Sequence, residues 1–258
     1  MIFYTADLFE KNDPYLLSAD TDSDGNAVIA IVGKDTDCTF YGIATLQMML
    51  SSFGNKEGKI LDVQIEDYAG VAFRGFIEGY YGLPWSNEDR MSLMRFGGDY
   101  KMTSYIFAPK DDEYHKGKWR DLYPEEELAK IKEMVKVGND SKCRFVWTAH
   151  PFMGGFNQAQ ADQEIQALLR KFDQLYDAGV RQFGVLGDDV GSLPRTIVIN
   201  MMTKVNKSFH ETIIIILSVR LGSDESTSSS CMGKHIMLSR GHCKYSIDNS
   251  ITCVNVVC

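Results

Sequence analysis

Two consecutive carboxylates, Asp188 and Asp189, follow an apolar run at residues 183–187. Adjacent anions repel each other, so a protein that holds them together usually separates their pKa values, leaving one charged and the other able to carry a proton. A pair divided in this way is suited to acid–base catalysis. Because successive side chains of a strand point to opposite faces, both groups can act on one atom only just beyond a strand end.

Two other interpretations of this pair stay open. The first is a polar loop in which one aspartate caps the following helix, which for an arbitrary pair of aspartates is favoured by about three to one. The second is a metal-dependent hydrolase, since hard divalent cations bind carboxylate oxygens. The sequence shows no further cluster of acidic residues or histidines that forms an obvious ligand set, so the metal site ranks lower and we expect no metal.

Two earlier segments also carry residue types that can bind a ligand. Residues 74–82 combine three glycines with three aromatic residues. Glycine lets a ligand approach the backbone closely, and tyrosine rings suit the C–H faces of sugars. Lys110, in the segment 108–112, can donate hydrogen bonds to substrate hydroxyls. The structural alternatives are a bulged core strand that leads into a tight turn, and a surface ion pair that contributes little.

Apolar runs alternate with helical periodicity over the middle of the chain. The expected strands span residues 72–80, 104–108, 144–148 and 182–186, and the expected helices span residues 87–96, 125–137, 159–178 and about 195–209. Ser86 and Asp89 resemble a capping box, Pro124 suits a helix start, and Gly179 can end a helix.

Four strand–helix units in series predict an α/β fold with a parallel sheet, either doubly wound or a (β/α)8 TIM barrel. The strands end in polar or aromatic residues and no glycine-rich phosphate loop follows them, which favours the barrel, where such ends share one mouth. Ahead of them, residues 27–33, 40–53 and 59–68 predict a strand, a helix and a strand. We therefore expect part of a small α/β domain over residues 1–68 and the first half of a barrel over residues 69–205.

Residues 206–258 form an atypical tail. An isoleucine run, a serine-rich stretch and scattered cysteines and histidines follow one another there without a clear helix or strand period. The cysteines form no C-x-x-C pair and have no regular spacing, so a zinc site has a prior of about one in twenty. We expect this segment to be disordered or to come from a shifted reading frame.

Charge and hydropathy exclude several classes of partner. The 258-residue chain has a net charge of -8 and contains no long basic run, which argues against binding a nucleic-acid backbone. The apolar run at residues 213–217 is too short to cross a bilayer, and residues 1–10 lack the pattern of a signal peptide. A neutral substrate fits this composition better, with no nucleic acid and no membrane as partner.

Three motifs in order, at residues 74–85, 105–112 and 187–189, closely resemble glycoside hydrolase family 84. This family of β-N-acetylglucosaminidases includes bacterial enzymes named hyaluronidases and the O-GlcNAcases. The resemblance covers roughly residues 25–205. It implies substrates that contain N-acetylglucosamine, glycans or glycoproteins, and no metal or organic cofactor.

Carried over by motif, the resemblance implies that Asp188 binds and orients the acetamido N–H of the substrate and that Asp189 is the general acid and then the general base. Gly75 and Lys110 are implied to contact the sugar. The implied mechanism is substrate-assisted and retaining, and it proceeds through an oxazoline. Bacterial members of the family are usually exported, so an extracellular location follows by analogy alone.

This sequence also departs from the family pattern. Nothing after about residue 205 resembles the sugar-binding residues of the later barrel strands, so we expect an incomplete module. The alternative is a catalytically inactive fragment with at most weak glycan binding. A half barrel leaves the edges of its first and fourth strands open, and we therefore expect self-association through these edges.

Overall fold

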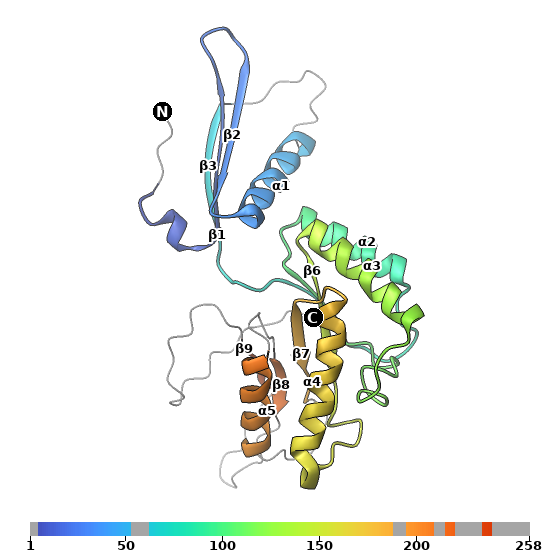
Figure 1. Ribbon diagram of the computed structural model, residues 1–258. Helices are drawn as coiled ribbons and strands as arrows, with labels where there is room; N and C mark the ends of the chain where they lie inside the picture. Colours follow the sequence, from blue (N-terminus) through green and yellow to red (C-terminus); the bar gives the residue numbers. More distant parts are fainter. Residues whose placement is uncertain (1–4, 53–61, 188–194, 209–214, 220–233, 239–258) are drawn as a thin grey trace, which may run out of the picture.

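The computed structural model describes residues 5–52, 62–187, 195–208, 215–219 and 234–238 (Figure 1). Within them, a small antiparallel sheet precedes a sheet of four parallel strands, and each sheet has its own apolar core. None of the described helices has the length and apolarity that crossing a membrane requires.

The small sheet has β1 (Asn12–Thr21) at its centre, between β2 (Ala27–Gly33) and β3 (Val63–Ala69). Helix α1 (Thr36–Ser52) packs on one face over a core of Tyr15, Leu17 and Tyr41. Strand β1 was not among the predicted strands, because Pro14 and its polar neighbours disfavour a central strand. The ladder shifts register between Asn12 and Tyr15, so Pro14 lies at an irregularity where its missing N–H breaks no regular pairing.

The larger sheet has the order β4-β5-β6-β7, with every neighbouring pair parallel. Its strands are β4 (Gly75–Glu78), β5 (Ser104–Phe107), β6 (Arg144–Ala149) and β7 (Gln182–Val185). Helices α2 (Asn87–Asp99), α3 (Glu125–Ser141), α4 (Ala161–Asp177) and α5 (Arg195–Ser208) follow these strands in turn. The prediction of an α/β fold built from four consecutive βα units is confirmed.

Local signals explain where these helices begin and end. Ser86 and Asp89 form the predicted capping box at the start of α2. Pro124 immediately precedes α3, where an N–H group has no helical partner to lose. Gly179 adopts a φ of 101° after α4, and the N–H groups of Gly179 and Val180 donate to the carbonyls of Tyr176 and Leu175. This pattern is a Schellman motif, and it turns the chain into β7.

The core of the larger sheet lies under its helices. Its fully buried large side chains include Met94, Trp119, Trp147, Phe172 and Phe183. The opposite face carries a smaller cluster of Ile106, Ala108, Val146 and Leu186. A parallel sheet that is apolar on both faces is typical of barrels and other α/β folds.

The tail contains more regular structure than we expected. Strands β8 (Ile215–Val219) and β9 (Lys234–Leu238) form an antiparallel pair, and β8 lies beside β7. The sequence shows no clear strand period here, but isoleucine and valine have high strand propensity. The expectation that residues 206–258 are disordered or come from a shifted reading frame stays a prediction. The predicted boundary at residue 68 falls inside β3, and the division into domains stays a prediction.

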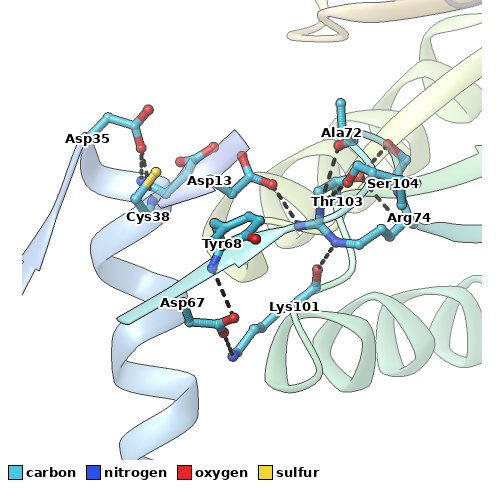
Figure 2. Close-up of polar contacts among 12 residues, drawn as sticks. Asp13, Asp35, Cys38, Asp67, Tyr68, Ala72, Arg74, Lys101, Thr103 and Ser104 are labelled. Carbon is cyan, nitrogen blue, oxygen red and sulfur yellow. Dashed lines mark hydrogen bonds and ion pairs between the residues drawn. The ribbon is translucent and has the colours of Figure 1, made fainter. Parts of the chain in front are cut away.

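Ion pairs join the small unit to the amino ends of the parallel strands. Arg74, just before β4, lies 2.7 Å from Asp13, and Lys101, before β5, lies 2.8 Å from Asp67 (Figure 2). Arg144, the first residue of β6, lies 2.6 Å from Asp37 of α1. The aspartates all come from the small unit and the cations all come from the larger sheet, so charge complementarity sets how the two units dock.

We expect Arg74→Met to lower the free energy of unfolding by about 1 to 3 kcal/mol, because Arg74 also donates to the carbonyls of Val71 and Lys101. The matched control is Lys136→Met, which removes an exposed ion pair within α3 and should change stability by no more than about 0.5 kcal/mol. Urea unfolding at low and high salt measures both variants. Equal midpoints for the two variants would contradict a stabilising role for this junction.

Candidate active site

The loops that follow β4, β5 and β6 leave the sheet at its carboxyl edge and are hydrogen-bonded to one another. The N–H of Gly82, in the first loop, donates to Asp111 in the second at 3.1 Å. The N–H of His150, in the third loop, donates to the carbonyl of His115 in the second at 2.8 Å. These bonds make the three loops one connected surface, which is where a parallel α/β fold places a binding site.

Lys110 belongs to this surface. It follows β5 by three residues and is buried, with 6% of its surface exposed. The N–H of Ala108 donates to the carbonyl of Glu78, which keeps the start of this loop beside the end of β4. An ammonium group can donate up to three hydrogen bonds, and the predicted contact between Lys110 and the substrate stays a prediction.

Asp188 and Asp189 lie outside the described residues, and their roles stay predictions. The segment that leads to them is described. Leu186 donates its N–H to the carbonyl of Ala149 at 2.8 Å, so β7 ends beside the end of β6. This described segment therefore ends, at residue 187, at the same edge of the sheet that carries Lys110.

Gly75 lies elsewhere. It is the first residue of β4, paired with Ser104 at the amino end of β5, whereas Lys110 lies beyond the carboxyl end of β5. A Cβ at position 75 would lie 1.8 Å from the carbonyl oxygen of Ser104, so close strand packing requires glycine here. This placement speaks against the predicted contact between Gly75 and the sugar.

The glycine at the carboxyl edge is Gly79, which directly follows the last residue of β4. Gly79 belongs to the motif at residues 74–85, but no role was predicted for it. Its position after the strand was the available signal, because glycines that let a ligand approach are expected at the loop end of a barrel strand. Tyr80 and Tyr81 follow it, and Tyr81 is 61% exposed.

The loop after β5 is held from beneath by buried polar groups. Asp112 accepts the N–H of His115 at 2.7 Å, and burial raises the pKa of the Asp112 carboxyl group against the effect of this bond. The Nδ1 atom of His115 lies 2.8 Å from the carbonyl oxygen of Thr148 in β6. The loop is thereby tied to the neighbouring strand.

Arg120 joins the same loop to the loop after β6. Its guanidinium donates to the carbonyls of Gly154 at 3.2 Å and Gly155 at 2.8 Å, and it pairs with Glu164 of α4 at 2.7 Å. The group also lies over the ring of Trp119, 4.3 Å from its centroid. Because arginine presents several donors in a rigid fork, one side chain can fix both loops.

Lys171 of α4 supports the end of the β5 loop from inside the protein. Its side chain is fully buried and donates to the carbonyl of Asp121, and the rings of Tyr114, Tyr123 and Trp147 surround its ammonium group. Burial lowers the pKa of Lys171 to about 8. One turn further along α4, Gln174 exchanges two hydrogen bonds with the backbone of Tyr123, at 2.8 and 2.9 Å.

The described part of this edge thus offers a buried lysine, a glycine without a side chain and exposed tyrosine rings. Among the described residues, no three histidine, cysteine, aspartate or glutamate side chains cluster as metal ligands would. Hydroxyl groups and apolar C–H faces are what such an edge can recognise, and both occur together in a sugar.

Comparison with known proteins identifies the family. The family model for β-N-acetylglucosaminidases matches residues 74–213, which is more than half of the chain. The chain belongs to this family. The matched segment contains β4 to β7 and all three motifs that carried the resemblance to glycoside hydrolase family 84, so this sequence-based prediction is confirmed.

Individual relatives agree with this assignment. Protein O-GlcNAcase from Rattus norvegicus and from Mus musculus are each 32% identical to this chain over 117 residues, which is 45% of this chain and 12% of the relative. Among solved structures, CpGH84D is 44% identical with a TM-score of 0.72, covering 83% of this chain and 36% of that one. CpGH84B is 35% identical with a TM-score of 0.70, covering 80% and 35%.

A more distant solved structure, a mutant of the Thermobaculum terrenum O-GlcNAc hydrolase, is 25% identical with a TM-score of 0.51, covering 58% of this chain and 35% of that one. The chain therefore spans about an eighth of the curated relatives and about a third of the solved ones.

The buried amine of Lys171 gives a prediction for the pH dependence of stability. Its pKa is about 8 in the folded protein and 10.5 as the ordinary value, so between these pH values the unfolded chain binds the extra proton. The contribution of Lys171 to the free energy of unfolding therefore rises with pH between pH 8 and pH 10.5, by up to about 1.4 kcal/mol per pH unit.

Unfolding of the wild-type chain and of Lys171→Met, compared from pH 7 to pH 9.5, isolates this contribution. We expect the wild type to gain stability relative to the variant above pH 8. The exposed neighbour Arg170, changed to Met, is the control and should give a difference that is independent of pH. If the free energy of unfolding of the wild type instead falls relative to that of Lys171→Met between pH 7 and pH 9.5, the buried amine does not have a lowered pKa.

Proposed function

We propose that this chain carries the sugar site of a β-N-acetylglucosaminidase that releases terminal β-linked N-acetylglucosamine. The observation that supports this most is the shared edge: the loop with Gly79 and Tyr80, the loop with Lys110 and the end of β7 all meet there, in a chain of this family. The names of its relatives, O-GlcNAcase and O-GlcNAc hydrolase, support a glycoprotein that carries N-acetylglucosamine as the substrate.

The proposed reaction uses the substrate's own acetamido group as the nucleophile. The acetamide oxygen attacks the anomeric carbon and forms an oxazoline, while the bond to the leaving oxygen breaks and Asp189 gives that oxygen a proton. Water then gives a proton to Asp189 and attacks the anomeric carbon, which breaks its bond to the acetamide oxygen and opens the oxazoline. Because this carbon is inverted twice, its configuration is retained. Holding the acetamide beneath the anomeric carbon supplies an effective molarity of roughly 10⁵ M or more.

The two aspartates would have different charges. Asp188, ionised, would accept the acetamido N–H and stabilise the positive charge that develops on the oxazoline nitrogen. Its negative charge would favour the protonated form of Asp189, which then can act as the acid. Lys110 would donate to a sugar hydroxyl from the neighbouring loop.

The alternative function is glycan binding without turnover. It is favoured by the partial span, since the chain covers about a third of the solved relatives. In this case the surviving edge would hold N-acetylglucosamine weakly, and the acid–base pair would have no correctly placed bond to act on.

Two assays on the same chain separate these functions. Hydrolysis of an aryl N-acetylglucosaminide, lost in Asp189→Asn by about a hundredfold or more, is the expected outcome for the glycosidase. Binding of N-acetylglucosamine-thiazoline, a mimic of the oxazoline, should weaken in Asp188→Asn. Glu88→Gln, a change in an exposed carboxylate of α2, is the control.

The outcomes are distinct. Thiazoline binding without hydrolysis would support the glycan-binding alternative. Absence of both, in a chain whose circular dichroism shows a folded α/β protein, would contradict the proposed function. Loss of activity after treatment with a chelator would instead support a metal-dependent hydrolase built on Asp188 and Asp189.

We further propose that the chain self-associates through the open edge of β4. In the described residues β4 pairs with β5 alone, so its other edge offers unpaired N–H and C=O groups. Light scattering coupled to size exclusion should show oligomers that grow with protein concentration. A monomer at all concentrations would contradict an accessible strand edge.

A further inference from the structure

Glu78 is a carboxylate at the edge of the sheet where the proposed sugar site lies. It is the last residue of β4, and its side chain is fully buried. A carboxylate in such a position could act as an additional acid or base, or it could organise the loop that follows. Its hydrogen-bond partners distinguish these roles.

Four donors occupy the two oxygens of Glu78. Arg90 of α2 donates through Nε to Oε2 and through Nη2 to Oε1, each at 2.8 Å. The hydroxyl group of Tyr105 donates to Oε2, and the backbone N–H of Trp85 donates to Oε1 at 3.2 Å. An ionised carboxylate accepts about four hydrogen bonds, so this one is saturated by the protein itself.

The donors come from the loop after β4, from helix α2 and from strand β5, so the Glu78 carboxylate connects these three segments. Trp85 lies at the far end of the loop that starts directly after Glu78, so one side chain closes residues 79–84 at both ends. Arg90 also donates to Asn87 at 2.7 Å in the first turn of α2, and Tyr105 lies in β5. Burial, and next the bond to Glu78, raise the pKa of Tyr105 well above its usual range, which keeps its hydroxyl group a donor.

We propose that Glu78 is a positioning residue. Its carboxylate fixes the loop 79–84 and through it presents Tyr80 and Tyr81 to the ligand, and it transfers no proton to the substrate. The part that concerns the ligand rests on the proposed sugar site, whereas the part that concerns the loop stands on the contacts alone.

Hydrogen exchange of the full chain tests the loop directly. We expect Glu78→Gln and Arg90→Met each to speed exchange of the amides at 79–85 by roughly 10- to 100-fold, since a hydrogen bond to a charged group is lost in each. Glu88→Gln is the matched control, because it removes an exposed carboxylate that pairs with Arg95 on the same helix. It should leave exchange of the loop unchanged.

Ligand binding distinguishes positioning from acid–base chemistry. A positioning residue predicts that Glu78→Gln and Arg90→Met weaken thiazoline binding to a similar degree, by about tenfold or more, because both break the same pair. A catalytic acid or base predicts lost hydrolysis in Glu78→Gln with unchanged affinity and unchanged loop exchange. That second pattern would overturn the proposal.

Two further outcomes still allow the role of Glu78 to be tested. If the wild-type chain binds no thiazoline, the proposed sugar site fails, and the exchange data alone still decide what Glu78 does. If the charge-changing variants fail to fold, Tyr105→Phe removes one hydroxyl donor and leaves the ion pair intact. This variant should raise loop exchange by a smaller factor, and no change in any variant would overturn the proposal.

Discussion

Parallel pairing of the four strands is the constraint on which the rest of the structure depends. The registers run without a shift from Gly75 opposite Ser104 to Ser104 opposite Arg144, and the pairing of Val146 with Gln182 continues them. In such a sheet every loop that follows a strand leaves from the same edge, however far apart these loops lie in the sequence. The opposite edge, with its row of cations, is left to bind the small unit.

Buried and half-buried charged side chains that hydrogen-bond to backbone groups give the loop edge its shape. Glu78 accepts from Trp85, Arg120 donates to Gly154 and Gly155, and Lys171 donates to Asp121. Removing a charge from water is unfavourable, and these groups offset that cost only where donors and acceptors match in position. The same requirement restricts the loops to few conformations, which is what a sugar site needs.

Sequence patterns predicted the elements of the larger sheet because each βα unit has local signals. The capping box at Ser86 and the left-handed Gly179 were visible without coordinates, and so was the alternation of strands and helices along the chain. Strand β1 was not predicted, because Pro14 is unusual in a central strand and the partners of β1 in β3 lie up to 57 residues away, as for Asn12 and Ala69. The position of β1 in the sheet depends on pairing with distant strands, which local strand propensity does not predict.

Sequence motifs predicted which segments contribute to the site, but not the contacts of each residue, because these contacts also depend on tertiary structure. A motif identifies a segment, but it does not say which end of a strand each of its residues occupies. This is why Gly75 was assigned to the sugar when it packs against Ser104. The contact between Arg120 and Glu164 joins residues 44 positions apart, and no periodicity reveals it. The supporting network could only come from the structure.

A crystal structure of this chain with N-acetylglucosamine-thiazoline would show whether the sugar site lies where we propose. We expect the ligand at the carboxyl edge of β4 to β7, with its acetamido-derived nitrogen on Asp188 and a sugar hydroxyl on Lys110. A ligand bound elsewhere, or Asp188 and Asp189 on the far side of the sheet from Lys110, would contradict it.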